Sequence, residues 1–169
     1  DIIMPVMDGV ATLEKINKGE QAKELTRLAV SLAQEARKRT GKINVVIGGS
    51  IAPLEDCYQP TLVPSDDKLL QEHREQARYL ADSGVDFIFI ETMNTIREAK
   101  AAMEGSQKAG LFAAISFVCN ADGNLLSGES IEDAFSAVLP YNPIAILTNC
   151  SPPKIAEVSL YKLLKIANI

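Results

Sequence analysis

Three residue types are scarce in this chain of 169 residues, which has no tryptophan, one histidine and three cysteines. With His73 as the only imidazole, a Ser-His-Asp or Cys-His catalytic arrangement is almost excluded. His73 lies among charged residues in EHREQARYL, so we expect it on a solvated helix face. An odd number of well-spaced cysteines does not indicate a disulfide framework, and a reducing cytoplasm is the expected compartment.

Long apolar runs and an excess of basic charge are also absent. No stretch approaches the roughly 18 apolar residues that span a bilayer, and no basic segment followed by an apolar one indicates a signal peptide. The net charge of −5 disfavours nucleic acids and anionic membranes as partners. Neither GxGxxG nor a Walker loop occurs, so the glycines of IGGS (47–50) are expected to allow close approach of backbone or ligand.

The dominant pattern is an alternation of short apolar runs with longer helical stretches. Apolar residues recur at helical spacing in 20–39, while DFIFIET (86–92) is a continuous run typical of a strand buried on both faces. Ser65 is the expected N-cap and Gly84 the expected C-terminal stop of a second helix. The predicted strands are 1–4, 44–50, 86–92, 111–119 and 144–150, and the predicted helices are 20–39, 66–82, 95–109, 130–138 and 153–167.

This alternation predicts a single α/β domain over residues 1–169, with parallel strands joined by right-handed helical crossovers. A doubly wound sheet and a (β/α) barrel both fit the pattern. In either architecture, functional residues gather where the strands end.

Two residues at predicted strand ends are candidates for chemistry. Glu91 ends the run FIFI, where it could pair with a substrate ammonium or simply serve as an N-terminal acid of the next helix. Cys150 ends IAILTN, where a thiol could bind a soft metal or pack as a small hydrophobic residue. Cys119 is expected in the core and Cys57 in a loop. A zinc site made from all three thiols is an alternative that the spacing does not require.

Three stretches carry a pattern in a fixed order: Gly-Ser-x-x-Pro and Glu-Thr within 45–102, Ser-Gly within 116–134, and Asn-Cys within 146–153. Together they resemble the homocysteine S-methyltransferase family, from about Thr12 to Pro153. The resemblance implies a (β/α)8 barrel that transfers a methyl group to the sulfur of homocysteine, giving methionine. In this family zinc lowers the pKa of the thiol, so that a metal-bound thiolate attacks the methyl donor.

The resemblance also implies roles for individual residues. Glu91 matches the glutamate that holds the homocysteine amino group, and Asn149 matches a pocket residue beside the metal. Cys150 matches one of three cysteine ligands of zinc. Ser50, with Gly48 and Gly49, matches a loop that lines the pocket. Homocysteine and a methyl donor are therefore the expected partners.

Two parts of the family pattern are missing from this sequence. One is the Gly-Gly-Cys-Cys segment that supplies the other two zinc ligands, and the other is a first strand with an Asp-Gly segment. We therefore expect a partial (β/α)8 TIM barrel, about units 2 to 6 of 8, that is inactive alone and binds zinc weakly. The chain begins with Asp1 rather than Met, so either its start was processed or it is missing.

The opening stretch DIIMPVMDGV (1–10) resembles the phosphoacceptor loop of a response-regulator receiver domain. A receiver also needs an acidic pair ahead of Asp1 and a Lys-Pro after its last strand, and the sequence contains neither. We interpret the likeness as a coincidence or a junction of two coding sequences, with Asp1-Ile2-Ile3 fitting a barrel strand. A receiver-type phosphorylation switch is a remote alternative.

A non-catalytic barrel remnant remains an alternative function. Such a protein would bind a small amino acid or a pterin-like ligand through Glu91 and would lack the metal. The sequence does not distinguish betaine, S-methylmethionine, S-adenosylmethionine or a cobalamin- or folate-borne methyl as donor.

Overall fold

The computed structural model describes residues 2–3, 21–41 and 44–167. The receiver-like segment falls mostly outside these residues, apart from Ile2 and Ile3. These two residues form a short strand, β1, that pairs with β2, within the strand predicted over residues 1–4.

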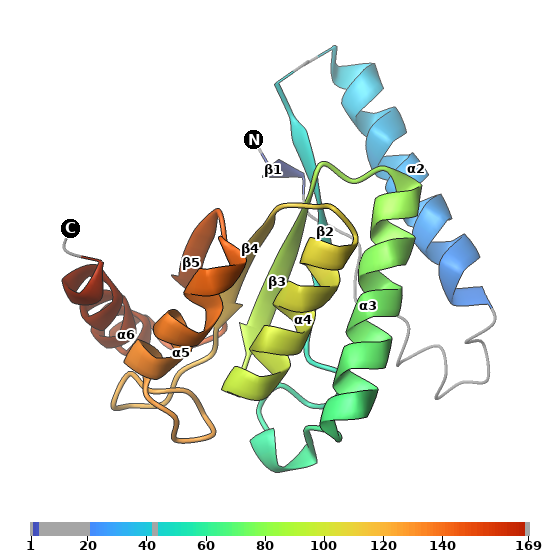
Figure 1. The fold of residues 1–169 in the computed structure, drawn as a ribbon. Coiled ribbons are helices and arrows are strands. Elements are labelled where there is room, and N and C mark those ends of the chain that lie inside the picture. The colour runs from blue at the N-terminus through green and yellow to red at the C-terminus, as the bar shows by residue number, and fades with distance from the viewer. Residues whose placement is uncertain (1, 4–20, 42–43, 168–169) are drawn as a thin grey trace.

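The described residues form an α/β fold with one parallel sheet (Figure 1). Its strands lie in the order β1-β2-β3-β4-β5, and every neighbouring pair is parallel. The strands are β1 (Ile2–Ile3), β2 (Val46–Ile51), β3 (Phe87–Met93), β4 (Ala113–Phe117) and β5 (Ala145–Thr148). The helices are α2 (Ala22–Thr40), α3 (Asp66–Ser83), α4 (Ile96–Lys108), α5 (Ile131–Val138) and α6 (Pro153–Ile166), with short 3-10 turns at Pro60–Leu62 and Leu139–Tyr141.

The strand order distinguishes the two architectures that the sequence pattern left open. In a doubly wound sheet the order reverses at a switch point, whereas these strands follow one another without reversal. Successive helices contact each other from α2 to α6, and Figure 1 shows α2, α3 and α4 along one side of the sheet. A doubly wound sheet is therefore wrong for the described residues, and the singly wound order is the one found in β/α barrels.

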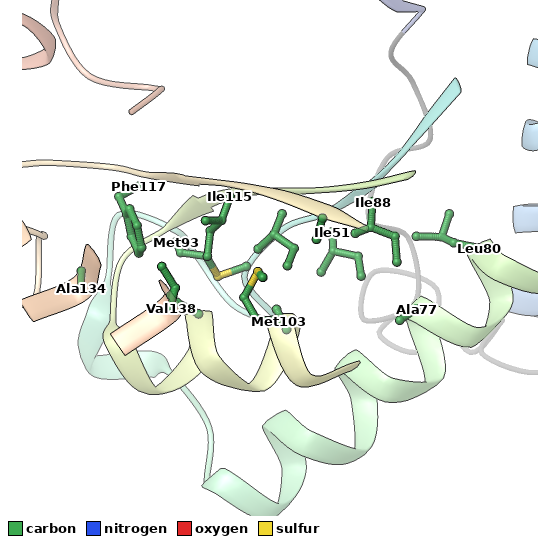
Figure 2. Packing of buried hydrophobic residues seen from close by; sticks show 14 of the residues in the cluster. Ile51, Ala77, Leu80, Ile88, Met93, Met103, Ile115, Phe117, Ala134 and Val138 are labelled. Atoms are coloured by element: carbon green, nitrogen blue, oxygen red, sulfur yellow. The ribbon is translucent and has the colours of Figure 1, made fainter. Parts of the chain in front are cut away.

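The hydrophobic core lies between the sheet and its helices (Figure 2). Ile88, Ile90 and Ile115 point to this side and are completely buried. Phe87 and Phe89 alternate with them on β3 and are only half-buried. The expectation that residues 86–92 are buried on both faces is thus wrong within the described part of the chain, because the helices cover one face of the sheet.

Helix ends agree with the local sequence signals. Ser65 is the N-cap of α3, although its side chain makes no capping hydrogen bond. Gly84 adopts a left-handed conformation (φ 82°), and its N–H donates to the carbonyls of Ala81 and Leu80. A residue without Cβ adopts that conformation at little cost, which explains why α3 ends there.

The solvated position predicted for His73 is wrong. His73 is completely buried on the side of α3 that packs against α4. The two helices approach closely at Gly105, where an added Cβ would lie 2.8 Å from the carbonyl oxygen of His73. Charged neighbours in the sequence indicate a solvated helix, but they do not reveal which of its residues face the next helix.

None of the helices in the described residues is both long enough and apolar enough to cross a membrane.

Candidate functional site

The predicted site residues lie where the parallel strands end. Ser50 is near the end of β2 and Glu91 near the end of β3, on the side of the sheet opposite the buried Ile51 and Ile90. The Ser50 hydroxyl donates a hydrogen bond to Oε1 of Glu91. The second carboxylate oxygen accepts no hydrogen bond from a described residue, so it can accept one from a ligand.

A bulge in β3 brings a further residue to this edge. Ile90 pairs with Ile115, but Met93 pairs with Phe117, so β3 carries one more residue than β4 between these pairs. Thr92 takes up the extra length with a left-handed backbone (φ 64°). A β-branched residue rarely adopts this conformation, which costs about 1–3 kcal/mol.

Thr92 connects the end of β3 to the residues that follow β5. Its backbone N–H donates to Oγ of Ser116 at 3.3 Å. Its hydroxyl accepts a hydrogen bond from Nδ2 of Asn149 at 3.0 Å and donates to Sγ of Cys150 at 3.6 Å. The Glu-Thr pair is part of a motif in the sequence, but no sequence signal indicated a role for Thr92.

Cys150 is the exposed thiol of this cluster. Its backbone is left-handed (φ 50°), and its carbonyl oxygen accepts a hydrogen bond from the Tyr58 hydroxyl at 3.3 Å. Asn149 has a buried Oδ1 with no hydrogen-bond partner among the described residues. Because buried polar atoms are nearly always paired, this oxygen is a candidate acceptor for a ligand N–H.

The loop after β2 brings Cys57 and Tyr58 to the same place. Burial raises the pKa of the Cys57 thiol, and the negative charges of Asp56 and Cys150 raise it further. The pKa of Tyr58 is also raised, chiefly by the negative charge of Cys150. No sequence signal pointed to Tyr58, because its contact with Cys150 joins residues 92 positions apart.

Buried Asn94 and partly buried Glu129 hold the other two loops at this edge. Asn94 is completely buried, and its Nδ2 donates to the Cys57 carbonyl at 2.9 Å. Its own carbonyl accepts the N–H of Ser127. Glu129 reaches back to the N–H of Ile96 at 3.0 Å, at the start of α4. These contacts link the loops after β2, β3 and β4.

The thiols do not gather into a three-cysteine site. Cys119 is buried in the core, as predicted, whereas Cys57 is half-buried and Cys150 exposed. The described residues contain no group of three histidine, cysteine, aspartate or glutamate side chains arranged to hold a metal ion. The alternative of a zinc site built from all three thiols is therefore wrong within that part of the chain. Cys150, exposed and soft, fits a zinc site as one ligand, but the described residues do not complete the set.

Comparison with known proteins identifies one family. The model of the family described as Homocysteine S-methyltransferase matches residues 9–168. Homocysteine S-methyltransferase YbgG of Bacillus subtilis is 30% identical over 148 residues, which cover 78% of this chain and 47% of that protein. Homocysteine S-methyltransferase 2 of Arabidopsis thaliana is 28% identical over 164 residues, covering 82% and 49%.

A solved structure shows the same fold. The metallated form of the homocysteine methyltransferase MmuM from Escherichia coli superposes with a TM-score of 0.83 at 23% identity, covering 98% of this chain and 62% of that one. The chain spans about half the length of the curated relatives it matches. On the match over residues 9–168, the chain belongs to the homocysteine S-methyltransferase family.

Proposed function

We propose that this chain carries the homocysteine-binding part of a site that transfers a methyl group to the homocysteine thiol. We further propose that its strands are about units 2 to 6 of a (β/α)8 barrel. The observation that carries the proposal is a pair of contacts made by consecutive residues. Glu91 accepts a hydrogen bond from Ser50, and the hydroxyl of Thr92, the next residue, contacts Cys150. An anionic group at the end of β3 and a soft thiol after β5 thus lie at the same edge of the sheet, which suits a ligand with an ammonium group and a sulfur.

Each polar group in the site has a distinct task in this proposal. Glu91 pairs with the ammonium group of homocysteine through the carboxylate oxygen that Ser50 leaves free. The Ser50 hydroxyl orients that carboxylate. The buried Oδ1 of Asn149 accepts an N–H from the substrate, while its Nδ2 remains on Thr92. Charge-assisted hydrogen bonds of this kind are about twice as strong as neutral ones.

Cys150 would be one ligand of zinc, and the remaining ligands would come from outside the described residues. When bound, zinc lowers the pKa of a coordinated thiol so that the thiolate can attack a methyl donor. Two residues of this chain hold the Cys150 thiol in position. The Thr92 hydroxyl fixes the position of Sγ, and Tyr58 fixes the backbone of Cys150. The cytoplasm is the compartment that this chemistry favours, because it keeps thiols reduced.

The test is homocysteine binding, measured by ligand-observed NMR with the wild-type chain and two variants. Glu91→Gln removes the charge but keeps the shape, and we expect it to weaken binding about ten- to a hundredfold. Glu35→Gln, on the exposed surface of α2, changes the net charge equally and should leave binding unchanged. Equal affinity of the wild type and Glu91→Gln would refute the role of Glu91.

A non-catalytic small-molecule-binding protein is the second candidate, favoured by the lack of a three-ligand metal group among the described residues. Zinc titration distinguishes the two functions. If zinc binding depends on Cys150 and strengthens homocysteine binding, the methyl-transfer proposal is supported. If homocysteine binds through Glu91 with no response to zinc, the non-catalytic function is supported instead.

A further inference from the structure

Two ionisable side chains, His73 on α3 and Glu98 on α4, are completely buried and have no task in the proposed function. Nε2 of His73 lies 3.2 Å from Oε1 of Glu98. The same carboxylate oxygen accepts the backbone N–H of Leu54 at 2.8 Å. Glu98 therefore connects α3, α4 and the loop that follows β2.

Stability of the fold alone does not account for this buried pair. Nδ1 of His73 and Oε2 of Glu98 have no hydrogen-bond partner among the described residues. Replacing an incompletely paired buried ion pair with apolar side chains of similar size is often neutral or stabilising. Two leucines would therefore hold the helices together about as well, but they could not accept the Leu54 N–H.

Glu98 also does not act as a cap for its own helix. Thr95 is the N-cap of α4 and accepts the N–H of Glu98. In a capping box, a glutamate at this position reaches back to the N-cap N–H. The Glu98 carboxylate instead reaches His73 and Leu54, so it serves the neighbouring loop.

The loop that begins at Leu54 leads directly to the candidate site, and internal hydrogen bonds join its residues 56–59. The Asp56 carboxylate accepts the Tyr58 N–H at 2.9 Å and Nε2 of Gln59 at 2.8 Å. The Asp56 carbonyl accepts the Gln59 N–H at 2.9 Å. These hydrogen bonds hold residues 56–59 together, two positions after Leu54. Within this segment, Tyr58 donates to the Cys150 carbonyl.

We propose that Glu98, oriented by His73, is a positioning residue that holds loop 54–59 so that Cys57 and Tyr58 lie beside Cys150. Loss of the Leu54 contact loosens one end of the loop, whose Cys57 carbonyl Asn94 still holds, and the Tyr58 contact with Cys150 then opens more often. The proposal concerns the geometry of the loop and does not require that the chain bind homocysteine or zinc. Its failure is therefore distinguishable from a failure of the proposed function.

The three cysteines provide a built-in test. Half-buried Cys57 reports opening of the loop, exposed Cys150 reports the residue that the loop contacts, and core residue Cys119 reports loosening of the whole fold. Iodoacetamide labelling of the metal-free chain at one pH, resolved by peptide mass spectrometry, gives all three rates in one experiment. Rates are expressed relative to an unstructured cysteine peptide added to each reaction.

Three variants separate positioning from stability. The double variant His73→Leu with Glu98→Leu keeps the packing but loses the acceptor for the Leu54 N–H. Glu98→Gln keeps an acceptor oxygen. Met103→Ala removes a buried core side chain of α4 and leaves the Leu54 contact in place. If the double variant fails to fold, Glu98→Met with His73 retained replaces it.

We expect Cys57 of the double variant to be labelled about tenfold faster than in the wild type, with the Cys119 rate unchanged. A change of that size is the effect of losing a hydrogen bond to a charged group. Glu98→Gln should stay within about twofold of the wild type. Met103→Ala should raise the Cys57 and Cys119 rates together. The proposal is overturned if the double variant leaves Cys57 unchanged, if Cys119 rises in parallel, or if Glu98→Gln behaves like the double variant.

Discussion

Substitution of Gly105 by alanine tests the close approach of α3 and α4 that buries His73. An added Cβ would lie 2.8 Å from the His73 carbonyl oxygen, 3.0 Å from the carbonyl carbon and 3.1 Å from the Arg74 nitrogen. All three are backbone atoms, so they cannot rotate away as a side chain could. The two helices would have to move apart to admit the methyl group.

Two opposing effects set the size of the change. Alanine favours a helix over glycine by about 1 kcal/mol. Overpacking costs about 1–3 kcal/mol, and rigid backbone contacts place this case in the upper half of that range. We therefore expect Gly105→Ala to lower the free energy of unfolding by about 1–2 kcal/mol.

Urea unfolding monitored by far-UV circular dichroism measures this change. With an m-value of about 2 kcal/mol/M, the midpoint should fall by about 0.5–1 M. Lys100→Ala, on the exposed side of α4, is the matched control and should change the free energy of unfolding by no more than about 0.5 kcal/mol. A midpoint for Gly105→Ala above that of the wild type would mean that helix propensity dominates and that α3 and α4 do not meet as described.

Three further predictions concern the site. Cys150→Ser should remove most of the zinc affinity of the chain, measured by competition with a chromogenic chelator, whereas Cys119→Ser should not. Equal affinity of the two variants would refute a ligand role for Cys150. Thr92→Val keeps the shape of the side chain but removes the hydroxyl that contacts Sγ of Cys150. This variant should raise the alkylation rate of Cys150 severalfold, and an unchanged rate would contradict the role of Thr92. Because burial raises the pKa of Cys57, its thiolate forms at higher pH than in an unstructured peptide, and the midpoint of its alkylation–pH profile should lie above that of the peptide.

Local signals in the sequence predicted most of the secondary structure. Gly84 was expected to end a helix and does so with φ 82°, because this conformation depends on the residue itself more than on its surroundings. Parallel strands followed from the β/α alternation. The choice between a doubly wound sheet and a singly wound order did not, since strand order depends on contacts between distant segments.

The burial of His73 shows where the local signals end. Arg74, the next residue, remains partly exposed, while His73 is completely buried. Both lie in the same charged stretch, and only the position of α4 separates them. That position in turn depends on Gly105, 32 residues further along the chain, which lets the helices approach closely. Sequence neighbours therefore could not reveal that His73 meets Glu98.

Some residues of the site could likewise be predicted from the sequence, and others could not. The rule that functional residues follow strand ends placed Glu91 and Cys150 at one edge, and the family resemblance added Ser50, which the structure brings into contact with Glu91. Thr92 could not be found by this rule, because regular alternation along β3 would point its side chain to the face opposite Glu91.

The bulge in β3 cancels that alternation and brings two consecutive side chains, Glu91 and Thr92, to the same edge. Its cost is a left-handed backbone at a β-branched residue, which the hydrogen bonds of Thr92 to Ser116, Asn149 and Cys150 offset. Strain retained at a strand end and balanced by polar contacts is typical of functional sites. A regular strand would cost less but would leave the Cys150 thiol without its partner, so the conformation of Thr92 itself argues that this edge is the site.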